Sequence, residues 1–399
     1  MIPPGYKVRM RDGSAVVQGS EGEAFLAGRL EVGIELSDGS SAWLRPSRPG
    51  LAWRTGNVDQ LRHYTLSRFV FFRSELGRRV IESATSPFIV EFESWIPAAV
   101  LSEFSGPASV KALCDHHPTI HQDIPPVAGL LWRAGFLDEG HSGGPSVQDL
   151  WGFHELLFHD RSSTPRLGAP FGGMNPLRPP VTPAIKPPMS SVFVPLRVPD
   201  MRRLMREDAP FTSVLESRRS AGVPGATPLK LERLGEFLFR VAHYQESGRR
   251  PLPGAGGRHA LEFYVAPHAC EGLSSTLYHY QAIEHRLCQI APQPAAVLEM
   301  LRLAGMSWGR GGYYPRALLV LTARFGRMAD RYAAIAYRNL LLDAGIAIQT
   351  MYLVATSMNL GVCALGLNVP ELFAAATGID RAEETPVALM ALSEGFAHE

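Results

Sequence analysis

The sequence has few cysteines and almost no excess of positive or negative charge. Its four cysteines lie far apart and form no C-x-x-C pair: Cys114, Cys270, Cys288 and Cys363. This excludes a dense disulfide framework and favours a reducing cytoplasm as the compartment. Lysine and arginine total 39 and aspartate and glutamate 38, which gives a formal net charge of +1. Such a balance argues against a nucleic-acid duplex or an acidic membrane as a partner.

The sequence also lacks an uninterrupted apolar segment of membrane-spanning length. Its longest apolar run, residues 340–367, contains Asp343, Gln349 and Asn359. This polarity favours a buried helix followed by a strand over a membrane span. Residues 1–14 have no apolar core of signal-peptide length. We therefore expect a cytoplasmic protein without a membrane partner.

What the sequence does have is a globular composition, with 46% apolar residues. Its 399 residues, at roughly 150 per domain, predict two or three domains. Ten of the 32 prolines fall between residues 165 and 199. Because proline lacks a backbone donor and fixes its own torsion, this stretch should be an extended connector that wraps over another surface. We predict an N-terminal α/β region (1–140), a helical and proline-rich linker (141–200) and a C-terminal domain (201–399).

The N-terminal region mixes short strands with short helices. Asp-Gly pairs at 12–13 and 38–39 predict hairpin turns. Residues 126–137 predict a helix that ends at a glycine before a strand, which is a winged-helix layout. Its recognition segment has only Arg133 as a strong cation, so peptide binding along a strand edge is favoured over DNA binding.

One short segment of this region carries residue types that bind metals. Cysteine, aspartate and histidine side chains lie close together between Cys114 and His121. No second cysteine pair completes a tetrahedral set, and a proline interrupts the run. We expect no metal site.

From Met201 onward, helical and strand patterns alternate. Helices are predicted at 211–219, 230–241 and 330–358, and strands at 261–266, 317–324 and 361–367. This order predicts a single sheet layered with helices.

Three segments of the C-terminal domain carry residue types that suit a cofactor site. Arg218, Arg219 and Ser220 can hold a phosphate through forked, charge-assisted bonds, although two solvated helix-end arginines would have the same sequence. The glycine-rich loop at 253–257 lets backbone amides approach a flat ring or phosphate, but it also suits a tight turn. Tyr332 and Tyr337 follow a strand end, where they fit either a site or the edge of the core.

Taken together, these motifs resemble those of the SagB-type dehydrogenases, azoline dehydrogenases of the FMN-dependent nitroreductase superfamily. The chain contains, in order, R-R-S, R-P-x-P-x-x-G-G-x-H-x-L-E, R-Y-x-x-I-A-Y-R-N-L-L-L-D-A-G and L-G-V-C-A-L-G. Upstream, residues 151–162 read W-x-x-H-E-L-L-F-H-D-R-S, which is similar to a linker signature of the family. The resemblance covers about residues 151–395.

The resemblance implies an α+β, nitroreductase-like fold with a central sheet flanked by helices, assembled as a homodimer with FMN at the subunit interface. Family members oxidise thiazoline or oxazoline rings in ribosomally made peptides. The winged-helix-like N-terminal region resembles the peptide-recognition domains that accompany such enzymes. The implied partners are a leader-bearing or carrier-bound peptide and a cyclodehydratase. The FMN-binding residues implied fall into three groups. The phosphate and ribityl chain would be held by Arg218, Arg219 and Ser220. The flavin ring would be lined by Pro253, Gly254, Ala255 and Gly256, with Leu365 and Gly366 packed near it.

Two residues depart from the family's pattern. Arg331 precedes Tyr332 where azoline-oxidising members usually carry lysine, and Gly254 stands where serine is common. Arginine does not lose its proton, so Tyr332 is the expected base, with Arg331 as its electrostatic partner. Two alternatives remain open: an NAD(P)H-dependent, nitroreductase-like enzyme, and a non-catalytic peptide-binding scaffold of a modifying complex.

Overall fold

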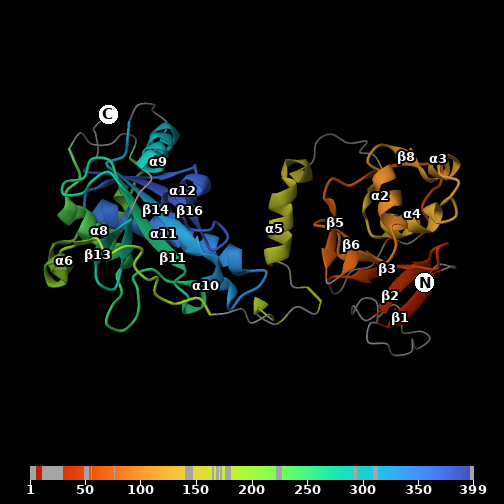
Figure 1. Ribbon diagram of the computed structural model, residues 1–399, viewed down its shortest axis with the longest axis horizontal. Helices are drawn as coiled ribbons and strands as arrows, with labels where there is room; N and C mark the ends of the chain where they lie inside the picture. Colours follow the sequence, from red (N-terminus) through yellow and green to blue (C-terminus); the bar gives the residue numbers. More distant parts are fainter. Residues whose placement is uncertain are drawn as a thin grey trace. The chain divides into compact units, whose positions relative to one another are not determined.

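The computed structural model describes residues 6–10, 30–48, 54, 56–75, 77–139, 147–163, 166–167, 170, 173–175, 181–221, 227–290, 294–308 and 313–395. The chain separates into two compact units, Met1–Phe171 and Gly172–Glu399 (Figure 1). We refer to them as the N-terminal unit and the C-terminal unit. The predicted division into three parts stays a prediction.

The N-terminal unit contains an antiparallel sheet with the order β1-β2-β3-β7-β6-β5. Its strands are β1 (Lys7–Met10), β2 (Leu30–Glu35), β3 (Ser41–Pro46), β5 (Val70–Glu75), β6 (Arg78–Ser83) and β7 (Phe88–Phe92). The predicted turn at 38–39 is confirmed, because Gly39 joins β2 to β3 with a φ of +80° that glycine adopts at little cost. The predicted turn at 12–13 lies outside the described residues.

Three helices and a small sheet complete the core of this unit. The helices are α2 (Ile96–Glu103), α3 (Val110–His116) and α4 (Ile124–Arg133). The small sheet has the order β8 (Ala108–Ser109), β4 (His63–Leu66) and β9 (Leu137–Asp138). Gly135, with φ +73°, ends α4 before β9, as the sequence predicts. The winged-helix assignment itself stays a prediction.

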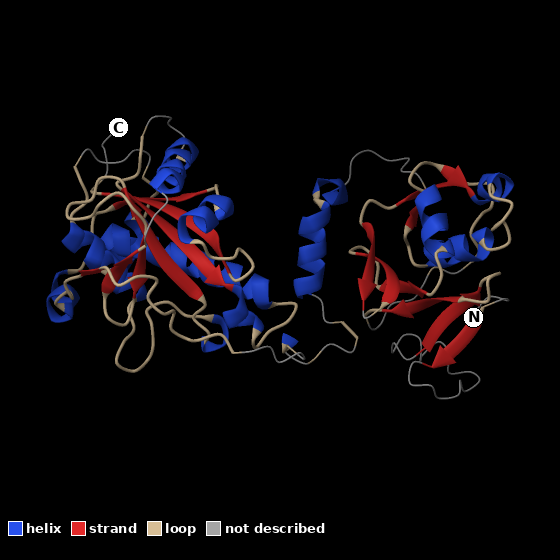
Figure 2. Ribbon diagram, in the orientation of Figure 1, coloured by secondary structure: helices blue, strands red, loops and turns tan. Residues whose placement is uncertain are grey.

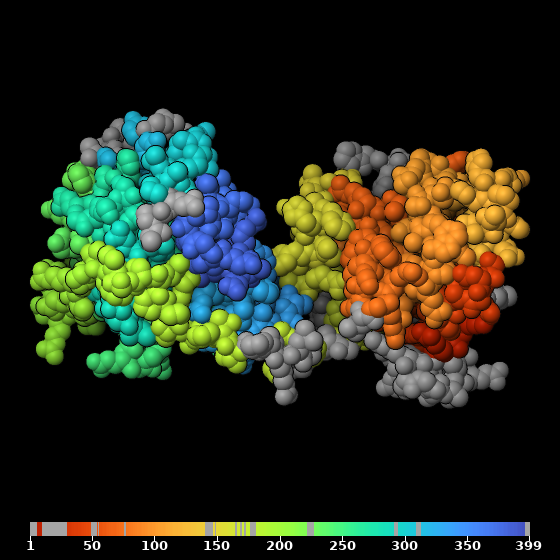
Figure 3. Space-filling model, viewed as in Figure 1, coloured from red at the N-terminus to blue at the C-terminus, as the bar shows by residue number. Residues whose placement is uncertain are grey.

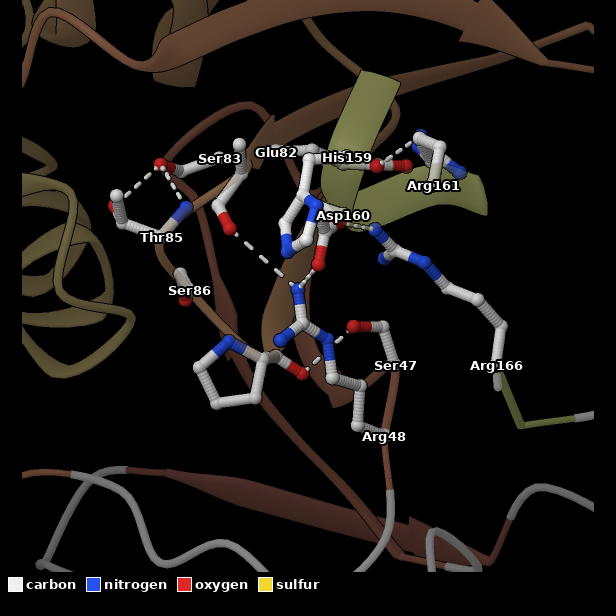
Figure 4. A network of polar contacts seen from close by, with 12 residues as sticks. Ser47, Arg48, Glu82, Ser83, Thr85, Ser86, His159, Asp160, Arg161 and Arg166 are labelled. Atoms are coloured by element: carbon white, nitrogen blue, oxygen red, sulfur yellow. Dashed lines mark hydrogen bonds and ion pairs between the residues drawn. The ribbon is translucent and has the colours of Figure 1, made fainter. Parts of the chain in front are cut away.

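Helix α5 (Phe153–Ser163), which follows the short helix η1 (Val147–Leu150), contains most of the 151–162 motif. Buried Asp160 lies between the guanidinium groups of Arg48 and Arg166 (Figure 4). Its neighbour Arg161 pairs with buried Glu82 of β6. These charged contacts tie α5 to the sheet of the N-terminal unit, so this part of the motif has a structural role.

The C-terminal unit is built on one antiparallel sheet (Figure 2). Its strand order is β10-β13-β12-β11-β14-β16-β15. Its strands are β10 (Phe193–Pro195), β11 (Leu261–Pro267), β12 (Tyr278–Gln281), β13 (Arg286–Gln289), β14 (Ala317–Arg324), β15 (Gly361–Leu365) and β16 (Glu384–Ser393). Helices and an antiparallel sheet in one unit confirm the predicted α+β class.

Helices cover both faces of this sheet. They are α6 (Met201–Glu207), α7 (Phe211–Ser217), α8 (Leu231–Ala242), α9 (Pro294–Ser307), α10 (Phe325–Ala329), α11 (Ala336–Ser357) and α12 (Pro370–Thr377). Along the fully buried strand β14, Leu319 and Leu321 pack in the core that includes α8 and α11. The intervening Leu318 and Val320 pack in the core that includes α9 and α12. The alternation of side chains along one strand therefore produces three layers.

The predicted helix over 330–358 is too long at its start. Turns cover residues 330–335, and α11 begins only at Ala336. Tyr332 instead forms a β-bridge with Met174, and this long-range pairing prevails over the helical pattern. Helix α11 is long and apolar enough to cross a membrane by length and composition, but Leu340, Ala344 and Ala347 lie in the core. The expectation of no membrane partner stays a prediction.

The proline-rich segment 181–200 runs over the surface of the C-terminal unit, as predicted (Figure 3). Arg324 Nη2 donates to the carbonyl oxygen of Pro183 at 2.9 Å. Lys186 forms an ion pair with buried Glu384 of β16. The segment ends in β10, which is an edge strand and so tolerates Pro195.

Candidate functional site

Helix α11 organises the candidate site, because two polar residues on it each hold one of the predicted cofactor segments. Asp343 contacts the glycine-rich loop, and Tyr352 contacts the segment after α7. The two residues are nine positions apart on the same helix. A rise of about 1.5 Å per residue separates them by about 14 Å along the axis. The site therefore has two ends.

At the first end, both carboxylate oxygens of Asp343 accept from the backbone nitrogen of Ala255, each at 3.1 Å. Asp343 is only 6% exposed. Burial raises the pKa of this carboxyl, and the hydrogen bond from Ala255 opposes that shift. Asp343 thus fixes the loop from the side of the core.

The predicted catalytic pair lies against the same loop. Gly256 has φ +58°, and a Cβ atom there would collide with the hydroxyl oxygen of Tyr332. Arg331 Nη1 donates to the carbonyl oxygen of Gly256 at 3.3 Å, and its guanidinium carbon lies 5.5 Å from the centre of the Tyr332 ring. The structure therefore brings Tyr332, Arg331 and the predicted loop residues Gly254, Ala255 and Gly256 together. Pro253 precedes them as an exposed residue.

A second set of contacts closes the base of the loop. Arg258 pairs with Asp330, whose side chain is 2% exposed. Arg258 Nε donates to the carbonyl oxygen of Arg327 at 3.1 Å, and Arg327 Nε donates to that of Arg258 at 3.0 Å. Burial lowers the pKa of Arg327. These reciprocal contacts join the loop to the turn that carries Tyr332.

At the second end, α7 stops at Ser217 and the chain continues as Arg218, Arg219 and Ser220. The hydroxyl oxygens of Ser220 and Tyr352 lie 2.9 Å apart. The guanidinium carbon of Arg218 lies 5.3 Å from the centre of the Tyr352 ring. Tyr352 thus contacts two of the three residues predicted to bind a phosphate.

Strand β15 reaches the same end of the site. The backbone nitrogen of Ala364 donates to the Tyr352 hydroxyl at 2.8 Å, and that of Ala221 donates to the Val362 carbonyl oxygen at 2.8 Å. The predicted residues Leu365 and Gly366 follow directly, the first half-buried and the second exposed. The preceding residue Ala364 shares the Tyr352 hydroxyl with Ser220, so the end of β15 lies near Ser220.

The two ends of the site along α11 together fit an elongated cofactor with an anionic end and a flat end. Arg218, Arg219 and Ser220 supply positive charge and a hydroxyl at one end. The glycine-rich loop supplies accessible backbone at the other. A Cβ atom built at Gly257 or at Gly366 would meet no heavy atom within 4 Å, so neither position is filled by protein. These features suit a cofactor that carries a phosphate and a flat ring.

The N-terminal unit contains a separate polar cavity of about 700 Å³. Arginine, hydroxyl and aspartate side chains line it, namely Arg48, Arg54, Arg68, Arg133, Ser67, Thr85, Ser86, Asp138 and Asp149. Among the described residues, no group of three or more histidine, cysteine or acidic side chains could hold a metal ion.

Asp343 and Tyr352 were not predicted as site residues. In the sequence, Asp343 stands out only as a lone carboxylate within the apolar run 340–367. Nothing in the sequence marks Tyr352, because its partners Ser220 and Ala364 lie 132 and 12 positions away in the chain.

Family models match the two units separately. Residues 216–395 match the nitroreductase family, and residues 64–167 match the cyanobactin oxidase ThcOx. The predicted relationship is confirmed at this level: a nitroreductase-family domain with the nitroreductase-like fold follows a ThcOx-type region.

Individual proteins similar to this chain share less than 30% sequence identity with it. A Methanocaldococcus jannaschii protein named as a nitroreductase is 28% identical over 172 residues, which cover 43% of this chain and 83% of that protein. Among solved structures, a Ralstonia eutropha protein named as a nitroreductase is 22% identical with a TM-score of 0.42, over 55% of this chain and 99% of that one. A chain of the E. coli microcin synthetase McbBCD complex with truncated pro-MccB17 bound is 20% identical with a TM-score of 0.40, over 53% of this chain and 76% of that one.

Proposed function

We propose that this chain, an oxidoreductase with a nitroreductase-family domain behind a ThcOx-type region, uses FMN to oxidise thiazoline or oxazoline rings of a modified peptide to thiazole or oxazole. The observation that carries the proposal is the position of Tyr332 and Arg331 against the glycine-rich loop that would line the flavin ring. The ThcOx-type match supports a peptide-modifying reaction over a general nitroreductase.

The oxidation removes one proton and one hydride from the azoline ring. FMN supplies the two-electron acceptor when it is bound. The proton leaves the ring carbon next to the peptide carbonyl, and the proposed acceptor is the oxygen of Tyr332 in its phenolate form, which becomes a neutral phenol. The guanidinium of Arg331 lies 5.5 Å from the centre of the Tyr332 ring and is the proposed electrostatic partner of this residue.

The chain's own residues suit the two ends of FMN. Arg218, Arg219 and Ser220 would hold the phosphate, and Gly254, Ala255 and Gly256 would present backbone to the ring. Leu365 and Gly366 would lie near the phosphate end instead of near the ring, where the resemblance places them, since Ala364 contacts Tyr352 there. Pro253, just before the loop, would complete the lining.

A second copy of the chain would cover α11. Apolar side chains on one side of this helix are 38–55% exposed in the single chain: Tyr337, Leu341, Leu342 and Ile346. An apolar surface of this kind marks a protein interface. It supports the proposed homodimer, whose interface would lie close to Asp343 and the glycine-rich loop.

The N-terminal unit is the proposed binding region for the peptide, and a cyclodehydratase is the proposed partner that forms the azoline. The ThcOx-type match over residues 64–167 supports this assignment. The arginine-lined cavity in the same unit offers donors for carboxylates and backbone carbonyls of a peptide.

The substitution Tyr332→Phe tests the proposal. It should leave FMN bound and abolish conversion of a thiazoline peptide to the thiazole, measured by mass spectrometry. Tyr313→Phe is the matched control, since Tyr313 is 49% exposed and lies outside the contacts described above. Unchanged thiazole formation by Tyr332→Phe would remove Tyr332 from the reaction.

A further inference from the structure

The hydroxyl group of Tyr352 lies within hydrogen-bond distance of a backbone N–H and of a serine hydroxyl. The ring is 8% exposed. Ala364 N lies 2.8 Å from the hydroxyl oxygen, and Ser220 Oγ lies 2.9 Å from it. A backbone N–H can only donate, so the tyrosine oxygen accepts from Ala364.

The single proton of Tyr352 is available to its second partner. Either hydroxyl can donate in this pair, because the tyrosine oxygen has a second lone pair. When Ser220 donates to a ligand atom that only accepts, Tyr352 must be the donor to Ser220 Oγ. Ser220 then accepts from Tyr352 and keeps its own hydroxyl proton for a third group. Ser220 is exposed, so that proton is available to a ligand.

Cys363 is the other neighbour that bears on the direction of this bond. Its thiol donates to the carbonyl oxygen of Ala364 at 3.4 Å. Burial raises the thiol's pKa, while a hydrogen bond with Tyr352 lowers it. A neutral thiol sulfur is a weak acceptor compared with a hydroxyl oxygen, so Ser220 is the better partner for the tyrosine proton.

The same tyrosine also positions the neighbouring charge. The guanidinium of Arg218 lies over its ring, 5.3 Å from the centre. Tyr352 of α11 thus contacts both the guanidinium of Arg218 and the hydroxyl of Ser220.

We infer that Tyr352 is a positioning residue that donates to Ser220 when a flavin phosphate accepts the Ser220 proton, and so makes the protein select FMN over riboflavin. The inference rests on the proposed FMN function. A phosphate oxygen only accepts, so a serine hydroxyl whose oxygen accepts from Tyr352 complements it. Riboflavin has no phosphate and gains nothing from this arrangement.

Binding titrations on the flavin-free full chain, with FMN and with riboflavin, test the inference. In Tyr352→Phe the ring remains beneath Arg218 and only the hydroxyl is lost. We expect FMN affinity to fall about tenfold, the size of a lost hydrogen bond to a charged group, and riboflavin affinity to stay within about twofold. Ser220→Ala should have the same effect, and the double variant should be no weaker than either single variant. Cys363→Ala should retain the preference for FMN.

The outcomes separate the inference from the proposed function. Equal losses for FMN and riboflavin in Tyr352→Phe, or additive effects of the two substitutions, would overturn the positioning role while leaving FMN binding in place. A wild-type chain that binds neither flavin would overturn the proposed function and the inference together. Thermal unfolding of each variant shows whether the fold is retained.

Discussion

The hydroxyl of Tyr332 occupies the space that a side chain at Gly256 would need. Gly256 also has φ +58°, a conformation that other residues rarely adopt. The glycine therefore serves two purposes: it shapes the loop and it admits the tyrosine. The proposed base and the proposed ring-binding loop are thus parts of one packing arrangement.

Gly256→Ala should abolish this arrangement. The added methyl group would push Tyr332 away, and a displacement of about 1 Å at a reacting group can lower turnover about 100-fold. Gly257→Ala is the matched control, because Gly257 has φ +68° but a Cβ there would meet no atom within 4 Å. Both variants should lose about 1 kcal/mol of stability from backbone strain. Steady-state turnover of an azoline peptide distinguishes them, and equal losses of turnover would contradict the packing role.

Asp343→Asn should become more stable relative to the wild type as pH rises. Burial raises the folded-state pKa of Asp343 above its ordinary value of 3.8. Below pH 3.8 the Asp343 carboxyl of the wild type is protonated in both the folded and the unfolded state. Between pH 3.8 and the raised folded pKa, it ionises in the unfolded state first, which lowers the free energy of unfolding of the wild type. The asparagine variant has no such loss. The free-energy difference from urea unfolding should rise through this window and then level off. A difference that is flat or falls with pH would contradict the prediction.

Leu342→Glu should separate the proposed homodimer. Leu342 of α11 is 55% exposed in the single chain and belongs to its apolar side. A buried, unpaired carboxylate at an interface is costly. Leu298→Glu on α9 is the control, since Leu298 is also 55% exposed. Light scattering should give a monomer for Leu342→Glu and a dimer for Leu298→Glu. A dimer for both variants would exclude this face of α11 from the interface.

Asp160→Asn should destabilise the N-terminal unit. The substitution removes the charge between Arg48 and Arg166 (Figure 4), and breaking a buried ion pair costs about 3 kcal/mol. Exposed Asp115 on α3 provides the control variant Asp115→Asn, which should be nearly neutral. Guanidinium unfolding measures both. A change below about 0.5 kcal/mol for Asp160→Asn, the range of ordinary surface substitutions, would mean that α5 is held by other contacts.

Local patterns predicted most of the elements that build the site. The strands around Leu261 and Ala317 and the helix around Leu234 follow from apolar periodicity. The phosphate-type motif at Arg218 and the glycine-rich loop are visible because their residue types and spacing are local. The structure places both at the ends of one helix, as a common site requires.

Contacts between distant segments were not predictable in the same way. The pairing of Tyr332 with Met174 delays the start of α11, and no local pattern contains it. Tyr352 lies on an apolar helix, and only the fold brings Ser220 and Ala364 to its hydroxyl. A single sequence records which residues are present, but not which of them meet across the sheet.

An anaerobic single-turnover experiment tests the central claim most directly. The FMN-loaded chain is mixed with a thiazoline-containing peptide, and flavin absorbance and peptide mass are followed together. The account predicts that the flavin bleaches in proportion to a peptide product that has lost two hydrogen atoms. A flavin that is reduced by NAD(P)H but stays oxidised with the peptide would contradict azoline oxidation and favour a nitroreductase-like activity.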